Sequence, residues 1–143
     1  MQPDAWPRRP LPETTGPRYE CELSHPAELR GLRAGLRTWL PGALTAPDHD
    51  GEVVESLLLA VDELATNGLR HGAAPVRVRA ARVPEGLLVD VSDEDPDHGP
   101  EPAVGRDPAR GGMGLHVVAR LTGERGWTVT GARKHVWACL RTA

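Results

Sequence analysis

The sequence VDELATNGLRHG (residues 61–72) closes the segment that decides the fold, an amphipathic helical pattern that begins near Glu52. At 3.6 residues per turn one side of this pattern is apolar, and it carries Val54, Leu57, Leu58, Val61 and Leu64. The opposite side is polar, and it carries Glu63, Asn67, Arg70 and His71. We therefore expect a long helix that packs one face on a core and presents the other to a ligand.

Glu63 and Asn67 stand four residues apart on the polar side, so a carboxylate and an amide oxygen are neighbours on the helix surface. Mg²⁺ keeps several waters and takes only one or two protein oxygens when phosphates supply the others. Asn67 can then hold the ion while Glu63 remains free to act as a base. The alternative is a pair of solvated side chains, which is the commoner occurrence when such a pair stands alone.

Length, charge and apolar patterning indicate a single-domain protein and argue against nucleic-acid binding and a membrane span. The 143 residues fit one domain with a substantial core, and the net charge of −3, with basic residues spread along the chain, gives no case for a nucleic-acid partner. No apolar run reaches the roughly 18 residues of a membrane span, and the first residues lack the apolar centre of a signal peptide. Cys21 and Cys139 lack a CxxC spacing, which predicts two reduced, buried thiols. We expect a cytoplasmic protein with no membrane association.

The order of the predicted elements indicates the fold class. Residues 1–17 are rich in proline and are expected to be a disordered leader, followed by one domain over residues 18–143. Apolar patterns predict strands at 19–23, 76–80, 87–93, 127–130 and 135–140, and helices at 26–40, 52–71 and from 111 onward. This order suits an α+β two-layer sandwich, with the helices on one face of a mixed or antiparallel sheet. The long aperiodic stretch 94–112 is typical of a functional lid.

A carboxylate at a strand end and glycines at a helix start are two further features that suit nucleotide binding. Asp93 ends a predicted strand, and a carboxylate there can accept a hydrogen bond from the amino group of adenine, worth roughly 1.5 to 3 kcal/mol. That is about ten- to a hundredfold in affinity, enough to favour ATP over GTP. The glycines of GGMG (residues 111–114) open a predicted helix, where phosphate can approach free backbone amides.

These segments together resemble the motifs of the GHKL, or Bergerat-fold, ATPases, the histidine kinase-like ATPase domain. ELATNGLRHG (residues 63–72) is similar to the N box of that family, VSD (residues 91–93) to the start of its first glycine box, and GMGL (residues 112–115) to its second. The resemblance covers about residues 19–140, and the N box is its most specific part.

The resemblance implies a role for each matching residue. Asn67 would hold Mg²⁺, Glu63 would be the catalytic base, and Asp93 would read adenine. Gly112 and Gly114 would contact the phosphates of ATP, within a nucleotide-binding set that also includes His71, Met113 and Leu115. His71, at the helix end, is expected to be a structural cap or a phosphate-side contact.

Within that family the chain is most similar to the small anti-sigma-factor serine/threonine kinases of the RsbW and SpoIIAB type. Such kinases hold a sigma factor and transfer the γ-phosphate of ATP to a Ser or Thr of an anti-anti-sigma (STAS-type) partner. The resemblance therefore implies both proteins as partners, and it implies a homodimer. In this chemistry positioning and charge neutralisation do most of the work, and Glu63 would accept the proton of the hydroxyl.

One departure from the family pattern leaves a second function open. The family places glycines after the adenine-reading aspartate, as D-x-G-x-G, whereas this chain continues as DEDPDHG (residues 93–99). A non-catalytic interaction module that sequesters a partner without turnover is the alternative. Arg106 and Arg110 are equally consistent with γ-phosphate contacts and with solvated side chains. Lys134, the only lysine, is expected to be exposed in a turn and is not a predicted phosphate ligand.

Overall fold

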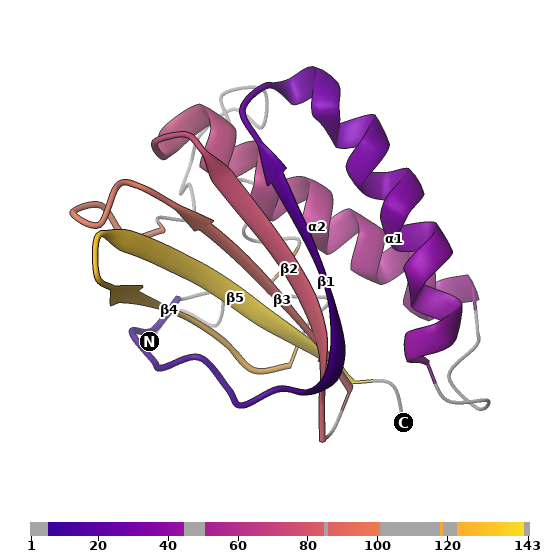
Figure 1. The fold of residues 1–143 in the computed structure, drawn as a ribbon. Coiled ribbons are helices and arrows are strands. Elements are labelled where there is room, and N and C mark those ends of the chain that lie inside the picture. The colour runs from indigo at the N-terminus through magenta and orange to yellow at the C-terminus, as the bar shows by residue number, and fades with distance from the viewer. Residues whose placement is uncertain (1–5, 45–50, 85, 101–117, 119–122, 142–143) are drawn as a thin grey trace, which may run out of the picture.

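The computed structural model describes residues 6–44, 51–84, 86–100, 118 and 123–141, which form a layer of helices on a five-stranded sheet (Figure 1). In chain order the elements are β1 (Thr15–Leu23), η1 (Pro26–Glu28), α1 (Leu29–Ala43), α2 (Gly51–His71), β2 (Val76–Val83), β3 (Gly86–Asp93), β4 (Arg125–Thr130) and β5 (Arg133–Arg141). The strand order is β1-β2-β3-β5-β4, and every neighbouring pair is antiparallel. The predicted α+β two-layer sandwich is thereby confirmed.

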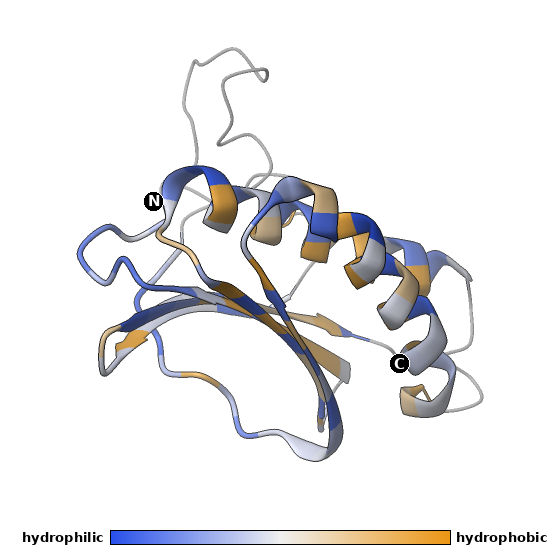
Figure 2. Ribbon diagram, turned by 45° about the horizontal axis from the view of Figure 1, so that its top comes forward, coloured by the Kyte–Doolittle hydropathy of each residue, from blue (hydrophilic) through white to orange (hydrophobic). Residues whose placement is uncertain are grey.

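The core lies between the helices and the sheet. The buried side chains of α1 recur every four residues, at Leu32, Leu36 and Leu40. The helix-facing residues of β2 and of the central strand β3 are small or branched, and they are Val76, Val78, Ala80, Leu87, Val89 and Val91. Figure 2 shows the apolar residues of both helices turned toward the sheet and the hydrophilic ones turned away from it. The helical period of 3.6 and the strand period of 2 thus meet in one apolar layer.

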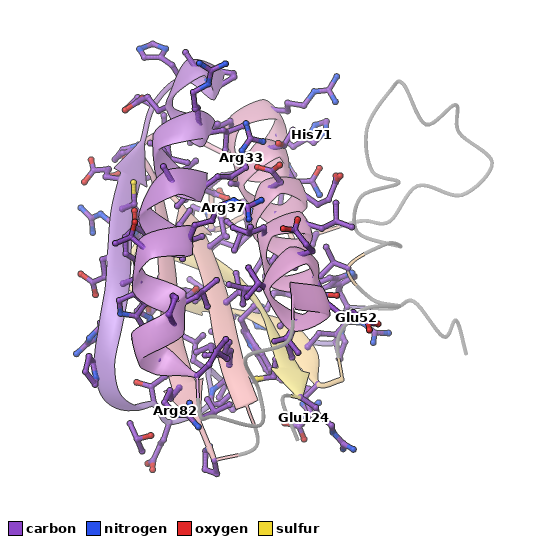
Figure 3. The ribbon with its side chains drawn as sticks, turned by 90° about the vertical axis from the view of Figure 1, so that its right-hand side faces the viewer. Arg33, Arg37, Glu52, His71, Arg82 and Glu124 are labelled. Carbon is purple, nitrogen blue, oxygen red and sulfur yellow. The ribbon has the colours of Figure 1, made fainter. Side chains whose placement is uncertain are left out.

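Two ion pairs join α1 to α2 on the outer side of the helix layer (Figure 3). Arg33 Nη1 lies 2.7 Å from Asp62 Oδ2, and Arg37 Nη1 lies 3.0 Å from Glu55 Oε1. These groups are half exposed, and pairs of this kind contribute only about 0 to 1 kcal/mol to stability. The pairs therefore orient the helices more than they hold them together.

Residues 6–14, here called the N-terminal arm, run along the outer edge of β4 and then across the sheet to β1 (Figure 1). Arg9 N donates to the carbonyl oxygen of Trp127 at 2.9 Å, and Trp127 N donates to that of Pro7 at 3.0 Å. The side chain of Trp6 is buried, with 7% of its surface exposed. The expected disorder of residues 1–17 is therefore wrong for residues 6–17, because β4 offers unpaired backbone groups that composition does not reveal.

The arm also supplies an apolar cover to the face of the sheet that the helices leave open, here called the second face. Leu11 packs there on a small buried cluster, formed by Val83, Leu88 and Trp137, with Cys139 beside it. Trp137 Nε1 donates to the carbonyl oxygen of Arg9 at 3.2 Å. Trp137 is almost fully buried, and part of its cover comes from the arm.

The rest of the second face is polar and centres on Asp90, which is buried. Its carboxylate lies 3.0 Å from His135 Nδ1 and 3.3 Å from Arg79 Nη2. The other ring nitrogen of His135 lies 2.9 Å from Thr130 Oγ1. Side chains of three neighbouring strands and the β4 end thus form one connected hydrogen-bond network.

Cys21 and Cys139 are free and only half-buried, on opposite faces of the sheet. In the part of the chain that the structure describes, no helix combines the length and the apolarity that crossing a membrane requires.

Candidate functional site

The polar end of α2 lies directly on the sheet because residue 68 is a glycine. A Cβ at Gly68 would stand 3.3 Å from both methyl carbons of Val76 and 3.6 Å from Cγ1 of Val91. A larger side chain would need the strands to give way. This close approach carries the last turns of α2, with Asn67 and His71, to the ends of β2 and β3.

The end of α2 then meets the end of β3. Gly72 follows the helix, and a Cβ there would collide with Oδ2 of Asp93. The backbone N–H of Glu94 donates to the carbonyl oxygen of Ala73 at 2.9 Å, which ties the two chain segments together. The sequence motifs of residues 63–72 and 91–93, predicted as separate parts of one site, therefore lie side by side.

Asp93 itself is buried, with 3% of its surface exposed. Its Oδ1 accepts a hydrogen bond from the backbone N–H of Asp95 at 2.8 Å, and its Oδ2 lies 3.5 Å from Nζ of Lys134. Two carboxylate oxygens offer about four acceptor positions, so the group retains capacity for another donor. This is the chemistry that reading an amino group requires.

Lys134 lies inside the molecule, and the expectation that it is exposed in a turn is wrong. β5 begins at Arg133, and Lys134 alternates in phase with Val136, Ala138 and Leu140, the residues of β5 that face the helices. Only 7% of its side chain is exposed. Extending the strand pattern of residues 135–140 back by one residue would have revealed this position.

The loop after Asp93 is closed by its own side chains in place of the glycines that the family places there. Asp95 accepts hydrogen bonds from the backbone N–H of Asp97 at 3.3 Å and pairs with Nδ1 of His98 at 3.0 Å. The hydrogen bond from His98 is the largest of the effects that lower the pKa of Asp95. Gly99 is needed at its position, because a Cβ there would stand 2.7 Å from the ring of Trp127.

Glu63 and Asn67 lie in partly buried environments on α2. Both are half-buried. Burial raises the pKa of Glu63, and the neighbouring carboxylate of Asp62 raises it further. Nδ2 of Asn67 is buried and has no hydrogen-bond partner within the described residues. A carboxylate that holds its proton more tightly than usual is a better base near neutral pH.

The donor set fits a magnesium ion that is bound together with phosphates. Among the described residues, no three His, Cys, Asp or Glu side chains gather closely enough to hold a metal ion by themselves. An amide oxygen on a helix with one carboxylate nearby is sufficient for Mg²⁺ when phosphate oxygens complete its coordination. Asn67 is the residue that would hold it.

His71 is exposed at the C-terminal end of α2 (Figure 3). With Arg70 it places basic side chains in the last helical turn, where the helix dipole favours positive charge. Its predicted role as a cap or a phosphate-side contact stays a prediction. The second glycine box, with Gly112, Met113, Gly114 and Leu115, lies outside the described residues, as do Arg106, Arg110 and the predicted third helix except Val118.

Comparison with known families gives a match to the histidine kinase-like ATPase domain over residues 24–140, which is most of the chain. The chain belongs to this family. No curated protein matches it. The match includes the α2 motif, the end of β3 and the β4–β5 hairpin, and it covers the described elements from η1 to β5 except Arg141, the last residue of β5. An ATPase domain of this family implies ATP binding.

Proposed function

We propose that this histidine kinase-like ATPase domain acts as an anti-sigma-factor serine/threonine kinase. It would bind a sigma factor and transfer the γ-phosphate of ATP to a Ser or Thr of a STAS-type anti-anti-sigma protein. The observation that carries the proposal is the close approach of Gly72 to the carboxylate of Asp93, which leaves no room for a side chain at residue 72. It brings an acceptor for adenine to the end of the helix that carries Glu63 and Asn67. A homodimer and a cytoplasmic location belong to the same proposal.

In this proposal adenine recognition, magnesium binding and proton acceptance are assigned to side chains that lie at successive positions along the length of α2. Asp93 accepts the hydrogen bond of the adenine amino group at the C-terminal end of the helix. Asn67, one turn earlier, would hold Mg²⁺, which when bound neutralises charge on the phosphates. Glu63 lies a further turn away and accepts the proton of the attacking hydroxyl. Its raised pKa suits this task, because a base works best when its pKa lies close to the working pH.

A non-catalytic interaction module is the second candidate, and the loop after β3 favours it. The loop bonds to itself, since Asp95 uses its carboxylate on Asp97 and His98. Asp93 already has Lys134 and the backbone of Asp95 as partners. A protein that only sequesters a partner would not need these groups to bind a nucleotide, so their contacts within the loop would be sufficient.

Nucleotide titration separates the two candidates. Fluorescent ATP with Mg²⁺ should bind saturably to the wild type, and Asn67→Ala and Asp93→Ala should each abolish this binding. Asp97→Ala is the matched control, because Asp97 is an exposed carboxylate of the same loop, and it should bind as the wild type does. Absence of binding by the wild type at about 1 mM ATP, the upper end of usual substrate affinities, would favour the interaction module.

Phosphoryl transfer is tested next, with labelled ATP and a STAS-type protein. Glu63→Gln should bind ATP normally and transfer phosphate at least about a hundredfold more slowly, the usual contribution of a general base. Glu52→Gln, at the other end of α2, is the control and should transfer at the wild-type rate (Figure 3). Equal rates in all three proteins would remove Glu63 from the mechanism.

A further inference from the structure

Lys134 has a position that the proposed function does not yet use. It stands directly opposite Asp93 in the register of β3 with β5. Its Nζ donates to the carbonyl oxygen of His98 at 2.6 Å and lies 3.5 Å from Oδ2 of Asp93. The ammonium group therefore joins the carboxylate at the strand end to the far side of the loop that follows it.

Two other carboxylates of this loop are paired elsewhere. Glu94 lies 3.5 Å from Nη1 of Arg133, and Asp95 lies 3.0 Å from Nδ1 of His98. Within the described residues, Lys134 is the cation that pairs with Asp93. Only 7% of the lysine side chain and 4% of the aspartate side chain are exposed. A charge buried this deeply is strongly disfavoured without its partner, so each group needs the other as its counter-charge.

We propose that Lys134 is a positioning residue that determines base specificity, by pairing with the carboxylate of Asp93 and fixing it as an acceptor for the 6-amino group of a purine. This inference rests on the proposed nucleotide site. An ionised carboxylate only accepts hydrogen bonds, so it pairs with the amino group of adenine and is repelled by the 6-oxo group of hypoxanthine or guanine. A neutral carboxylic acid can donate as well as accept, so it tolerates both kinds of base.

Removing the lysine therefore changes which base is preferred, and does not merely weaken binding. Without the ammonium group the buried carboxylate has no cation beside it, and burial then favours the neutral, protonated acid. The neutral acid can donate to a 6-oxo group and loses the strength of a charged acceptor toward the 6-amino group. If the lysine only held the loop in shape, its removal would lower the affinities for both nucleotides by the same factor and would leave the preference between them unchanged.

The test is a comparison of ATP with ITP, which differ at position 6 of the base. Affinities for both, with Mg²⁺, are measured by calorimetry on the full chain. The wild type should prefer ATP by about ten- to a hundredfold, as expected for a hydrogen bond to a charged acceptor. Lys134→Met should reduce this preference to about twofold or less, and Lys134→Arg, which keeps the cation, should retain most of it. Arg141→Met, which removes an exposed cation of the same strand, should leave the preference unchanged.

Asp93→Asn keeps the inference testable if Lys134→Met does not fold. An asparagine donates and accepts without needing a cation, so the double variant Asp93→Asn with Lys134→Met contains no unpaired buried charge. In the Asp93→Asn background, replacing Lys134 should change the ratio of the two affinities by less than about twofold, since the lysine acts through the charge of Asp93.

Three outcomes overturn the inference. If Lys134→Met weakens ATP and ITP by the same factor, the lysine is only structural. If the wild type binds both nucleotides equally, Asp93 does not read position 6, although nucleotide binding stands. If the wild type binds neither, the proposed function fails and the inference fails with it. The first two results leave the ATP site in place, so the two failures are distinguishable.

Discussion

The two faces of the sheet are built from the same strands in opposite ways. Toward the helices, β2, β3 and β5 present valines, leucines and alanines that are almost fully buried. Toward the second face, the intervening residues of the same strands form the network around Asp90, beside the apolar cluster under Leu11. Alternation along a strand sends neighbouring residues to different environments. One face is therefore held by apolar burial, and the other by directed polar contacts and one covering segment.

The largest effect is expected on the helix-covered face. Leu36→Ala removes a fully buried side chain of α1 and should lower the free energy of unfolding by about 3 kcal/mol, through lost burial and the cavity left behind. Urea denaturation followed by circular dichroism measures this change. Leu59→Ala is the matched control, since Leu59 of α2 is 42% exposed, and it should cost well under about 1 kcal/mol. Equal losses would mean that this face is not the principal core.

On the second face the expected effect depends on polar contacts. Asp90→Ala leaves Arg79 and His135 without their acceptor and should cost about 2 kcal/mol. The free energy of unfolding from urea titration measures it. Glu22→Ala breaks the exposed pair of Glu22 with Arg77 and should cost less than about 0.5 kcal/mol. If both variants are equally stable, the network around Asp90 contributes no more than a surface pair.

The N-terminal arm should contribute less to the free energy of unfolding than the contacts on either face of the sheet. Trp6→Ala should lower the free energy of unfolding by about 1.5 kcal/mol, the low end for a buried large side chain, because its Nε1 is buried and has no hydrogen-bond partner among the described residues. The arm pairs with β4 and covers the second face, and Trp6 itself belongs to the main core cluster, so we expect ATP affinity to stay unchanged. A variant that unfolds completely would show that the fold depends on the arm, and one with altered ATP affinity would connect the arm to the site.

The smallest effect is expected on the pH dependence of stability, through Glu63 of α2. The pKa of Glu63 is raised above 4.5, so the folded protein binds this proton more tightly than the unfolded chain does. Stability from this group is therefore greatest in acid and falls as the pH rises through the window above 4.5. Glu63→Gln should flatten that fall in urea titrations at a series of pH values. A steeper fall in the variant would mean that the sign of the shift is wrong.

Much of the fold could be predicted because its signals are local. The helical pattern from residue 52 predicted α2, observed as Gly51–His71, and the apolar patterns at 76–80 and 87–93 predicted β2 and β3. The end of β3 at Asp93 was also predicted. β1 begins at Thr15, earlier than the predicted residue 19, because its first residues pair with β2 without an apolar pattern of their own. The roles of Gly112 and Gly114 stay predictions.

The sequence by itself determined which residues share a helix face and which alternate along a strand, since both follow from backbone geometry over a few residues. It thereby placed Glu63 and Asn67 together on the polar side of one helix. Only the tertiary structure decided what lies against Asp93 and what covers Trp137. Lys134 reaches Asp93 through the register of two strands, and Arg9 meets Trp137 across 128 residues of chain. Such contacts depend on how distant segments pack, and no local pattern encodes them.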